Sequence, residues 1–178
     1  MDLIGNLVTW KRMAERGDAG AQYNMGVAYY TGQGFMRNYA EAAKWFRLSA
    51  EQGNRNAQFN LGNAYYRGEG VMQDYAEALK WYRKAAAQGD AGAQYNIGNA
   101  YSHGRGVEQD DCEAARWYTM AAEQGDMDAE FNLGNAYYNG CGVMRDYMQA
   151  AYWWRKAADQ GDADARHNLE TLYASGVL

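Results

Sequence analysis

The sequence repeats itself with a period of 36 residues, and this period constrains the fold more than any other feature. A glycine opens each copy, an alanine follows four residues later, and a tyrosine and a tryptophan recur in the same register. The opening glycines are Gly17, Gly53, Gly89, Gly125 and Gly161. A fixed period between about 20 and 50 residues is typical of solenoids, in which each unit packs only against its neighbours. We therefore predict a solenoid.

Each unit is predicted to hold two amphipathic helices, as the copy at residues 53–88 illustrates. Residues for a buried face recur at helical spacing in its first half and again in its second half. These residues are Ala57, Leu61, Ala64 and Tyr65, and then Ala78, Trp81, Tyr82 and Ala85. The predicted fold class is all-α, a stack of αα-hairpins with about ten helices and no strand.

The repeat also predicts the domain organisation, which is a single solenoid domain over residues 1–178. Residues 1–16 match a second helix that lacks its first and form an orphan helix. Four complete repeats follow, and residues 161–178 form a C-terminal half repeat. The complete repeats are residues 17–52, 53–88, 89–124 and 125–160.

Helix ends carry recognisable signals. Asn54 is expected to cap the first helix of its repeat, and Gly68 is expected to end that helix in the left-handed conformation. Asp74 and Glu77 have the spacing of a capping box. In such a box the Asp74 side chain accepts from the backbone N–H of Glu77, and the Glu77 side chain reaches back to the backbone N–H of Asp74.

A glycine in the middle of each first helix is unusual, because glycine costs up to about 1 kcal/mol relative to alanine there. Gly62 is one example, and the position recurs as Gly26, Gly98 and Gly134. We interpret it as the point where the second helix of the same repeat approaches closely. The last helix carries Glu170 at this position, as expected where no second helix follows it.

Charge is unevenly distributed along the chain. Residues 1–88 carry 11 Lys and Arg against 8 Asp and Glu, a balance of +3, whereas residues 89–178 carry 6 against 14, a balance of −8. No basic cluster alternates with aromatic residues as a nucleic-acid surface would require. No apolar run is long enough for a membrane span. The N-terminus does not resemble a signal peptide, which favours the cytoplasm, or the periplasm or exterior if a leader has been removed.

Residues for chemistry are sparse. The two histidines are His103 and His167, and the two cysteines, Cys112 and Cys141, fall at different offsets in their repeats. No metal-binding motif is present, and Ser102 and His103 are neighbours whose side chains diverge on a helix. We therefore predict no enzymatic activity, no metal and no cofactor.

One polar register is a candidate binding surface. The candidate residues are Asn24, Asn60, Asn96, Asn132 and Asn168, with Asn63, Asn99 and Asn135 one helical turn along from three of them. Asparagine is a mediocre helix former, so its repetition needs a reason. Either these amides grip a peptide backbone in a concave groove, or they bond between neighbouring helices. Tyr30, Tyr66 and Tyr138 would flank the groove or pack at its rim, and Ser102 interrupts that series.

The repeat unit strongly resembles the Sel-one-like repeat (SLR) family, which is related to the tetratricopeptide repeats. The resemblance rests on Ala-Gln-Phe-Asn-Leu-Gly-Asn-Ala-Tyr-Tyr at residues 57–66 and on the Asp-Tyr, Trp-Tyr and Ala-Ala pairs that follow. It implies a right-handed superhelix. In tetratricopeptide proteins, asparagine at matching places binds peptide backbones. Relatives usually carry proline where this chain has Met36, Met72, Glu108 and Met144, and a cysteine-rich branch has disulfide staples that this chain lacks.

The resemblance also implies a function. Members of this family are usually scaffolds that bind other proteins, often in bacteria. The expected function is thus a non-enzymatic adaptor that binds a protein or peptide, and the acidic half favours a basic partner. The alternative is a stoichiometric inhibitor or immunity protein that occludes a toxic effector. Neither nucleic acid nor a membrane is an expected partner.

Overall fold

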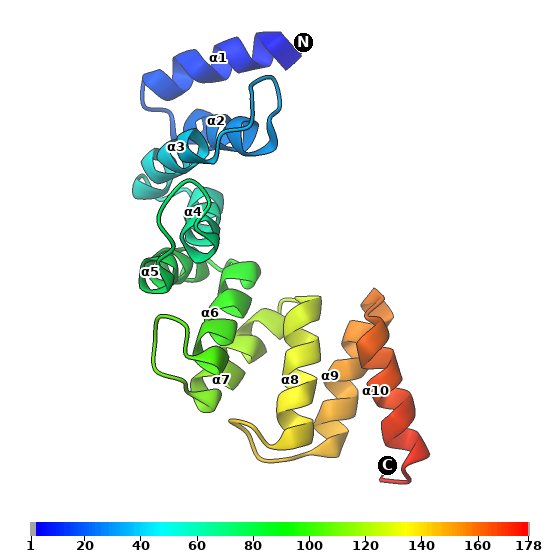
Figure 1. Cartoon of the computed structure of the whole chain (residues 1–178). Helices are drawn as coiled ribbons and strands as arrows, with labels where there is room; N and C mark the ends of the chain where they lie inside the picture. Colours follow the sequence, from blue (N-terminus) through cyan, green and yellow to red (C-terminus); the bar gives the residue numbers. More distant parts are fainter. Residues whose placement is uncertain (1–2, 178) are drawn as a thin grey trace. The chain divides into compact units, whose positions relative to one another are not determined.

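The computed structural model describes residues 3–177, with side chains from residue 7 onward, and this part of the chain forms ten α-helices and no strand. Figure 1 shows them in chain order. The helices are α1 (Leu3–Glu15), α2 (Ala19–Thr31), α3 (Tyr39–Glu51), α4 (Arg55–Arg67), α5 (Tyr75–Ala86), α6 (Ala91–His103), α7 (Asp111–Ala122), α8 (Met127–Asn139), α9 (Tyr147–Gln160) and α10 (Ala163–Ala174). The predicted fold class is confirmed.

The chain divides into two compact units, residues 1–89 and residues 90–178. In the first unit α1 packs on α2, α2 on α3, α3 on α4 and α4 on α5. In the second unit α6 to α10 pack in the same consecutive manner. Within each unit, consecutive helices thus contact one another, as a stack of αα-hairpins requires. No helix in residues 3–177 is both long and apolar enough to cross a bilayer.

The helix caps follow the predicted signals in part. The side chain of Asn54 accepts from the backbone N–H of Ala57 at 3.0 Å, and Gly68 ends α4 with φ 71°. The side chain of Asp74 accepts from the backbone N–H of Glu77 at 2.9 Å. The prediction that the Glu77 side chain accepts from the backbone N–H of Asp74 is wrong, because that N–H donates to the carbonyl of Tyr65 at 3.0 Å.

The location of Asp74 explains that difference. The chain returns beside the end of α4, where the last carbonyls have no partner within their own helix. The carbonyl of Tyr65 therefore takes the Asp74 N–H. Glu77 instead accepts from Lys80 Nζ at 2.7 Å and from the indole N–H of Trp81 at 3.1 Å.

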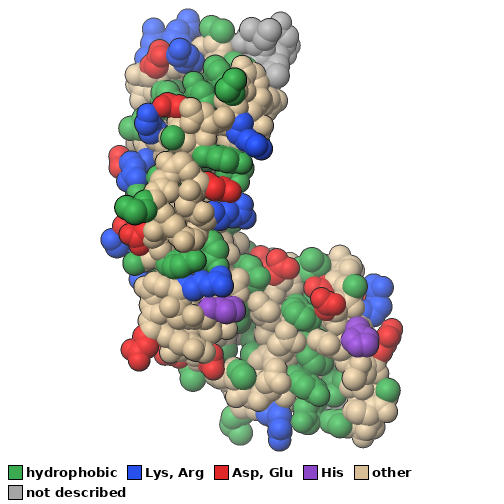
Figure 2. Space-filling model, in the orientation of Figure 1, with side chains coloured by type: hydrophobic (Ala, Val, Ile, Leu, Met, Phe, Trp, Pro, Cys, Tyr) green, Lys and Arg blue, Asp and Glu red, His purple; other side chains and the backbone are tan. Residues whose placement is uncertain are grey.

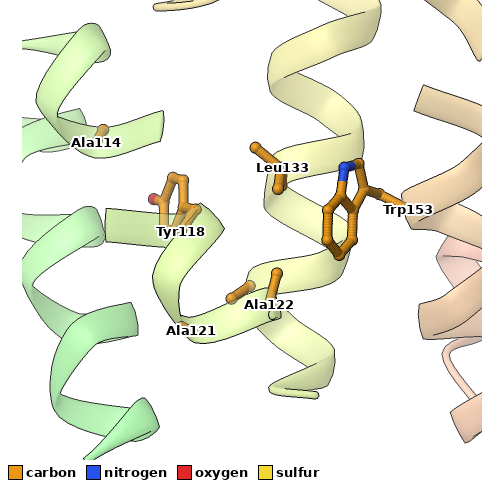
Figure 3. Packing of buried hydrophobic residues seen from close by; sticks show 7 residues of the cluster. Ala114, Tyr118, Ala121, Ala122, Leu133 and Trp153 are labelled. Carbon is orange, nitrogen blue, oxygen red and sulfur yellow. The ribbon is translucent and has the colours of Figure 1, made fainter. Parts of the chain in front are cut away.

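Alanines and large rings together make the core. In the second unit, Tyr118 of α7, Leu133 of α8 and Trp153 of α9 belong to one buried cluster, and alanines fill the space between them (Figure 3). The alanines are Ala114, Ala121, Ala122 and Ala129. Small side chains let the helix axes approach, and the rings supply most of the buried apolar area.

A buried glutamine links successive repeats, a role that was not predicted from the sequence. Gln58 of α4 is only 4% exposed. Its Nε2 donates to the carbonyl of Ala50 in the preceding helix at 3.1 Å, and its Oε1 accepts from Nε2 of Gln88 at 2.8 Å. Gln22 makes the same pair of bonds to Ala14 and Gln52. These bonds satisfy backbone and side-chain groups that burial would otherwise leave unpaired.

The mid-helix glycines lie where the interpretation placed them. A Cβ atom on Gly62 would lie 2.6 Å from the ring of Tyr82 and 3.3 Å from the carbonyl oxygen of Ala78. Gly26, Gly98 and Gly134 face the rings of Phe46, Tyr118 and Trp154 in the same way. Glu170 of α10 is exposed. The close approach of the two helices of one repeat therefore explains the glycine.

This geometry predicts unequal effects of two leucine substitutions. Gly62→Leu should lower the free energy of unfolding by roughly 1–3 kcal/mol or more, because the Tyr82 ring and the α5 backbone occupy the space. Glu170→Leu is the matched control and should change it by about 0.5 kcal/mol or less, because position 170 is exposed. Chemical denaturation of both variants measures the difference, and equal losses would contradict the packing role of Gly62.

Candidate interaction surface

The predicted asparagines form two rows on the first helices of the repeats. The first asparagine row is Asn24, Asn60, Asn96, Asn132 and Asn168, and the second asparagine row is Asn63, Asn99 and Asn135. All eight side chains are half-buried. Amides at that depth can bond to the protein on one side and to a ligand on the other, so the two rows must be judged by their partners.

The second asparagine row braces the two helices within the second, third and fourth repeats. Asn63 Oδ1 accepts from the hydroxyl of Tyr82 at 2.7 Å, and Asn99 Oδ1 accepts from the hydroxyl of Tyr118 at 2.7 Å. Asn135 Oδ1 accepts from the indole N–H of Trp154 at 3.1 Å. In this row the amide oxygen is thus used inside the protein. This agrees with the interpretation in which the asparagines bond between neighbouring helices.

The tyrosine donors in this brace stay protonated at neutral pH. Burial raises the pKa of Tyr118 to about 12, and burial also raises the pKa of Tyr82 well above its ordinary value. Each hydroxyl therefore keeps the proton that it donates to asparagine. The ring that contacts the mid-helix glycine is the same ring that carries this hydroxyl, so the brace and the close approach are geometrically coupled.

The first asparagine row lines surface hollows. Asn60 lies with Tyr30, Phe46 and Asn63 around a hollow of about 60 Å³ in the first unit. In the second unit Asn132 and Asn135 line a hollow of about 190 Å³. Asn168 lines a third, of about 290 Å³, with Asn135, Asn139 and Tyr138 among others. The structure thus brings asparagines of both rows together, while Asn24, Asn96, Asn99 and Tyr66 lie outside these three hollows.

The tyrosines predicted to flank the surface are packed in pairs. Each packs, tilted or edge-on, against a tyrosine at the start of the second helix of its own repeat. The ring centroids are 5.2 Å apart for Tyr30 and Tyr39, 5.2 Å for Tyr66 and Tyr75, and 5.4 Å for Tyr138 and Tyr147. Tyr30 also donates to Glu69 at 3.1 Å, and burial, followed by this bond, raises its pKa. Each of these rings is therefore held in place by its own repeat.

The third repeat lacks both members of this pair. Ser102 and Asp111 occupy the two positions. The interruption at Ser102 was predicted, whereas the matching change at Asp111 was not. The signal was available, since the residue after the cap of each second helix is otherwise tyrosine. The hollow of about 190 Å³ lies at this place, and Ser102, His103, Asp111 and Cys141 are among its lining residues.

The hollow contains one histidine, His103. Nδ1 of His103 lies 2.9 Å from the backbone oxygen of Asn99, in its own helix, and among the described residues no hydrogen bond joins its ring to Ser102 or Cys141. Nucleophilic catalysis needs a base within hydrogen-bond reach of the nucleophile. Within residues 3–177 there is also no group of three His, Cys, Asp or Glu side chains placed to hold a metal ion.

The repeats correspond to a known family. The Sel1 repeat matches residues 19–54, 55–90, 91–126 and 128–162, which cover the four helix pairs from α2 to α9 apart from Met127, the first residue of α8. The resemblance stated from the repeat motif is thereby confirmed. Among curated proteins, none matches the sequence significantly.

Solved structures of the same repeat class are also similar. A protective antigen of uropathogenic Escherichia coli displaying an SLR fold is 40% identical, with a TM-score of 0.93 over 96% of this chain and 37% of that chain. A Sel1 repeat protein from Oxalobacter formigenes is 39% identical, with a TM-score of 0.83 over 90% of this chain and 65% of that chain. The chain thus spans less than two thirds of the length of each.

A more distant structure shares the fold alone. Helicobacter pylori cysteine-rich protein B is 23% identical, with a TM-score of 0.60 over 75% of this chain and 96% of that chain. Here, by contrast, Cys112 and Cys141 are both free and exposed. These neighbours support the solenoid architecture predicted from the period.

The brace predicts a stability loss that depends on Tyr82. Asn63→Ala should lower the free energy of unfolding by about 1–3 kcal/mol, because the largely buried hydroxyl of Tyr82 loses its acceptor. In a Tyr82→Phe background the same substitution should cost clearly less, because no hydroxyl remains to satisfy. Asn60→Ala on the same helix is the control and should cost about 0.5 kcal/mol or less. Thermal and denaturant unfolding of the four variants would refute the brace if Asn63→Ala cost the same in both backgrounds.

Proposed function

The chain belongs to the Sel1 repeat family, and we propose that it is a non-enzymatic scaffold that binds a protein or peptide along its asparagine rows. Members of this family are generally non-enzymatic scaffolds for protein interaction. One observation carries the proposal for this chain. The hollows around Asn60 in the first unit and around Asn132 in the second combine amides with aromatic walls. Such surfaces suit an extended peptide, whose backbone offers both donors and acceptors.

The two asparagine rows have different roles in this proposal. The second row joins the two helices of repeats two, three and four through Tyr82, Tyr118 and Trp154. The first row lies one turn away and presents its amides to the bound chain. A rigid support reduces the conformational entropy that the surface loses on binding, which favours affinity.

Charge favours a basic or mixed partner for the second unit. Residues 90–178 contain 6 Lys and Arg against 14 Asp and Glu, a balance of −8. On the face drawn in Figure 2, basic side chains gather mostly over the first unit. An acidic surface raises the local concentration of a basic ligand and steers its approach. Two exposed, free cysteines fit a reducing compartment such as the cytoplasm.

The proposed peptide-binding surface can be tested with peptides from a random phage-displayed library that are selected for binding to the full chain. Asn60→Ala and Asn132→Ala should each weaken the best selected peptide by about twofold to tenfold, because each removes a neutral hydrogen bond of about 0.5–1.5 kcal/mol. Asn56→Ala is the matched control, since Asn56 lies on the same helix as Asn60 and is exposed. Calorimetric titration gives the affinities, and an unchanged affinity in both groove variants would contradict the proposal.

Electrostatic steering makes a separate prediction for peptides that carry net positive charge. Their association rate constant should fall as ionic strength rises, because the acidic second unit attracts them over a distance that salt shortens. The dissociation rate constant should change less. Stopped-flow fluorescence between low and high salt measures both, and an association rate that stays constant would exclude steering by the −8 charge of the second unit.

A further inference from the structure

The third repeat departs from the others at two positions that touch one another elsewhere. Where repeats one, two and four place a tyrosine pair, this repeat has Ser102 at the end of α6 and Asp111 at the start of α7. A hollow of about 190 Å³ lies there, and Asn132 and Asn135 of α8 form its opposite wall. In the first repeat, which has both rings, the corresponding hollow around Tyr30 and Asn60 measures about 60 Å³.

The ring beneath this hollow loses a neighbour. In the first repeat the centroid of Tyr30 lies 6.5 Å from Phe46, and in the fourth that of Tyr138 lies 5.3 Å from Trp154. Tyr118 is the corresponding residue of the third repeat, and it lines the hollow. Figure 3 shows Tyr118 on α7 with Ala114 one turn away. A flat group entering the hollow can therefore pack on Tyr118 as the missing tyrosine does in other repeats.

The polar rim of the hollow is rich in acceptors. Nδ1 of His103 faces the Asn99 carbonyl at 2.9 Å and must carry the proton there, which leaves Nε2 as an acceptor in the neutral ring. Ser102 adds a hydroxyl. Asp111 adds a carboxylate. When His103 is neutral, this carboxylate is the one formal charge among the residues that line the hollow. Its neighbour Asp110 caps α7 by accepting from Cys112 and Glu113, so the Asp111 carboxylate is not needed as the cap.

One wall of the hollow is held firmly. Gly142 adopts φ 71°, and a Cβ atom there would collide with the backbone of Asp111. The joint between α8 and α9 is thus pressed against the start of α7, with Cys141 at the rim of the hollow. A cavity fixed by backbone contacts is formed before its ligand arrives, which favours binding of a single side chain.

We propose that this hollow binds an arginine side chain of the partner, an inference that rests on the proposed scaffold function. A guanidinium is flat, stacks on aromatic rings and carries five N–H donors with no acceptor. Those properties match Tyr118 at the base, the acceptors at the rim and the carboxylate of Asp111. The charge of −8 on the second unit favours the same cation.

The test uses blocked amino acids as probes and needs no partner. Nα-acetyl-arginine methylamide is titrated into the isotope-labelled full chain, with the lysine and citrulline analogues in parallel. Saturable NMR shifts are expected at the side-chain amides of Asn132, Asn135 and Asn139 and at the backbone amides of Ser102 and Asp111. Citrulline has the same shape without the charge and should give no saturable shift. Equal binding of arginine and citrulline, or arginine shifts confined to other residues, would overturn the inference.

Three variants sharpen the test. Asp111→Asn keeps the shape and should weaken arginine binding by about tenfold or more, because a charge-assisted hydrogen bond becomes neutral. Glu113→Gln removes a charge from the same helix outside the hollow and should leave the affinity unchanged. Ser102→Tyr with Asp111→Tyr installs the pair that three repeats already carry. It should retain the melting temperature and abolish arginine binding, and retained binding in it or in Asp111→Asn would overturn the inference.

The selected peptides separate this inference from the proposed function. If peptides bind through Asn60 and Asn132 but lack arginine and are insensitive to the double tyrosine variant, the inference fails and the scaffold function stands. If blocked arginine binds at the hollow but no peptide depends on the asparagine rows, the proposed scaffold surface fails instead. An arginine required in the peptides, and lost from them when the double variant is used for selection, supports both.

Discussion

The contact between a glycine and an aromatic ring determines the geometry of every complete repeat. Gly62 gives up side-chain packing and helix propensity so that the ring of Tyr82 can lie against the backbone of α4. That approach brings the Tyr82 hydroxyl to Asn63, the residue next to the glycine. The hairpin, its hydrogen-bonded brace and the position of the neighbouring asparagine row all depend on this one contact. On α10 the position of this glycine is occupied by Glu170, which is exposed.

Much of this fold follows from the sequence because the repeat states each local rule several times. Two helices per repeat, the Asn54 and Gly68 caps, and the role of Gly62 were predictable from the repeat and its residue types. The absence of the Glu77–Asp74 backbone hydrogen bond was not predictable, because the carbonyl of Tyr65, which takes the Asp74 N–H instead, lies in another helix. The Gln58 brace was missed for a similar reason. A helical glutamine is normally expected to face solvent, and only the packing of the neighbouring helices shows that Gln58 is buried and hydrogen-bonded.

The candidate surface was only partly predictable. Spacing identified the asparagine register but could not separate its rows, because Asn60 and Asn63 differ mainly in which ring they meet. The departures from the repeat are more informative than its regularities. Ser102 and Asp111 change together and leave a hollow. Glu130 replaces the buried glutamine of the other repeats; it accepts from Gln160 at 2.8 Å, and Lys156 Nζ lies 3.0 Å from its Oε1 without hydrogen-bond geometry.

The central claim is that this regular framework presents its first asparagine row to a bound protein chain. A crystal structure of the full chain with a selected peptide tests that claim most directly. The account predicts an extended peptide whose backbone lies within hydrogen-bond distance of the Asn60 or Asn132 amide, about 2.7–3.2 Å. It also predicts that Asn63 and Asn135 keep their bonds to Tyr82 and Trp154. A peptide bound elsewhere, with the first asparagine row still facing solvent, would contradict the account.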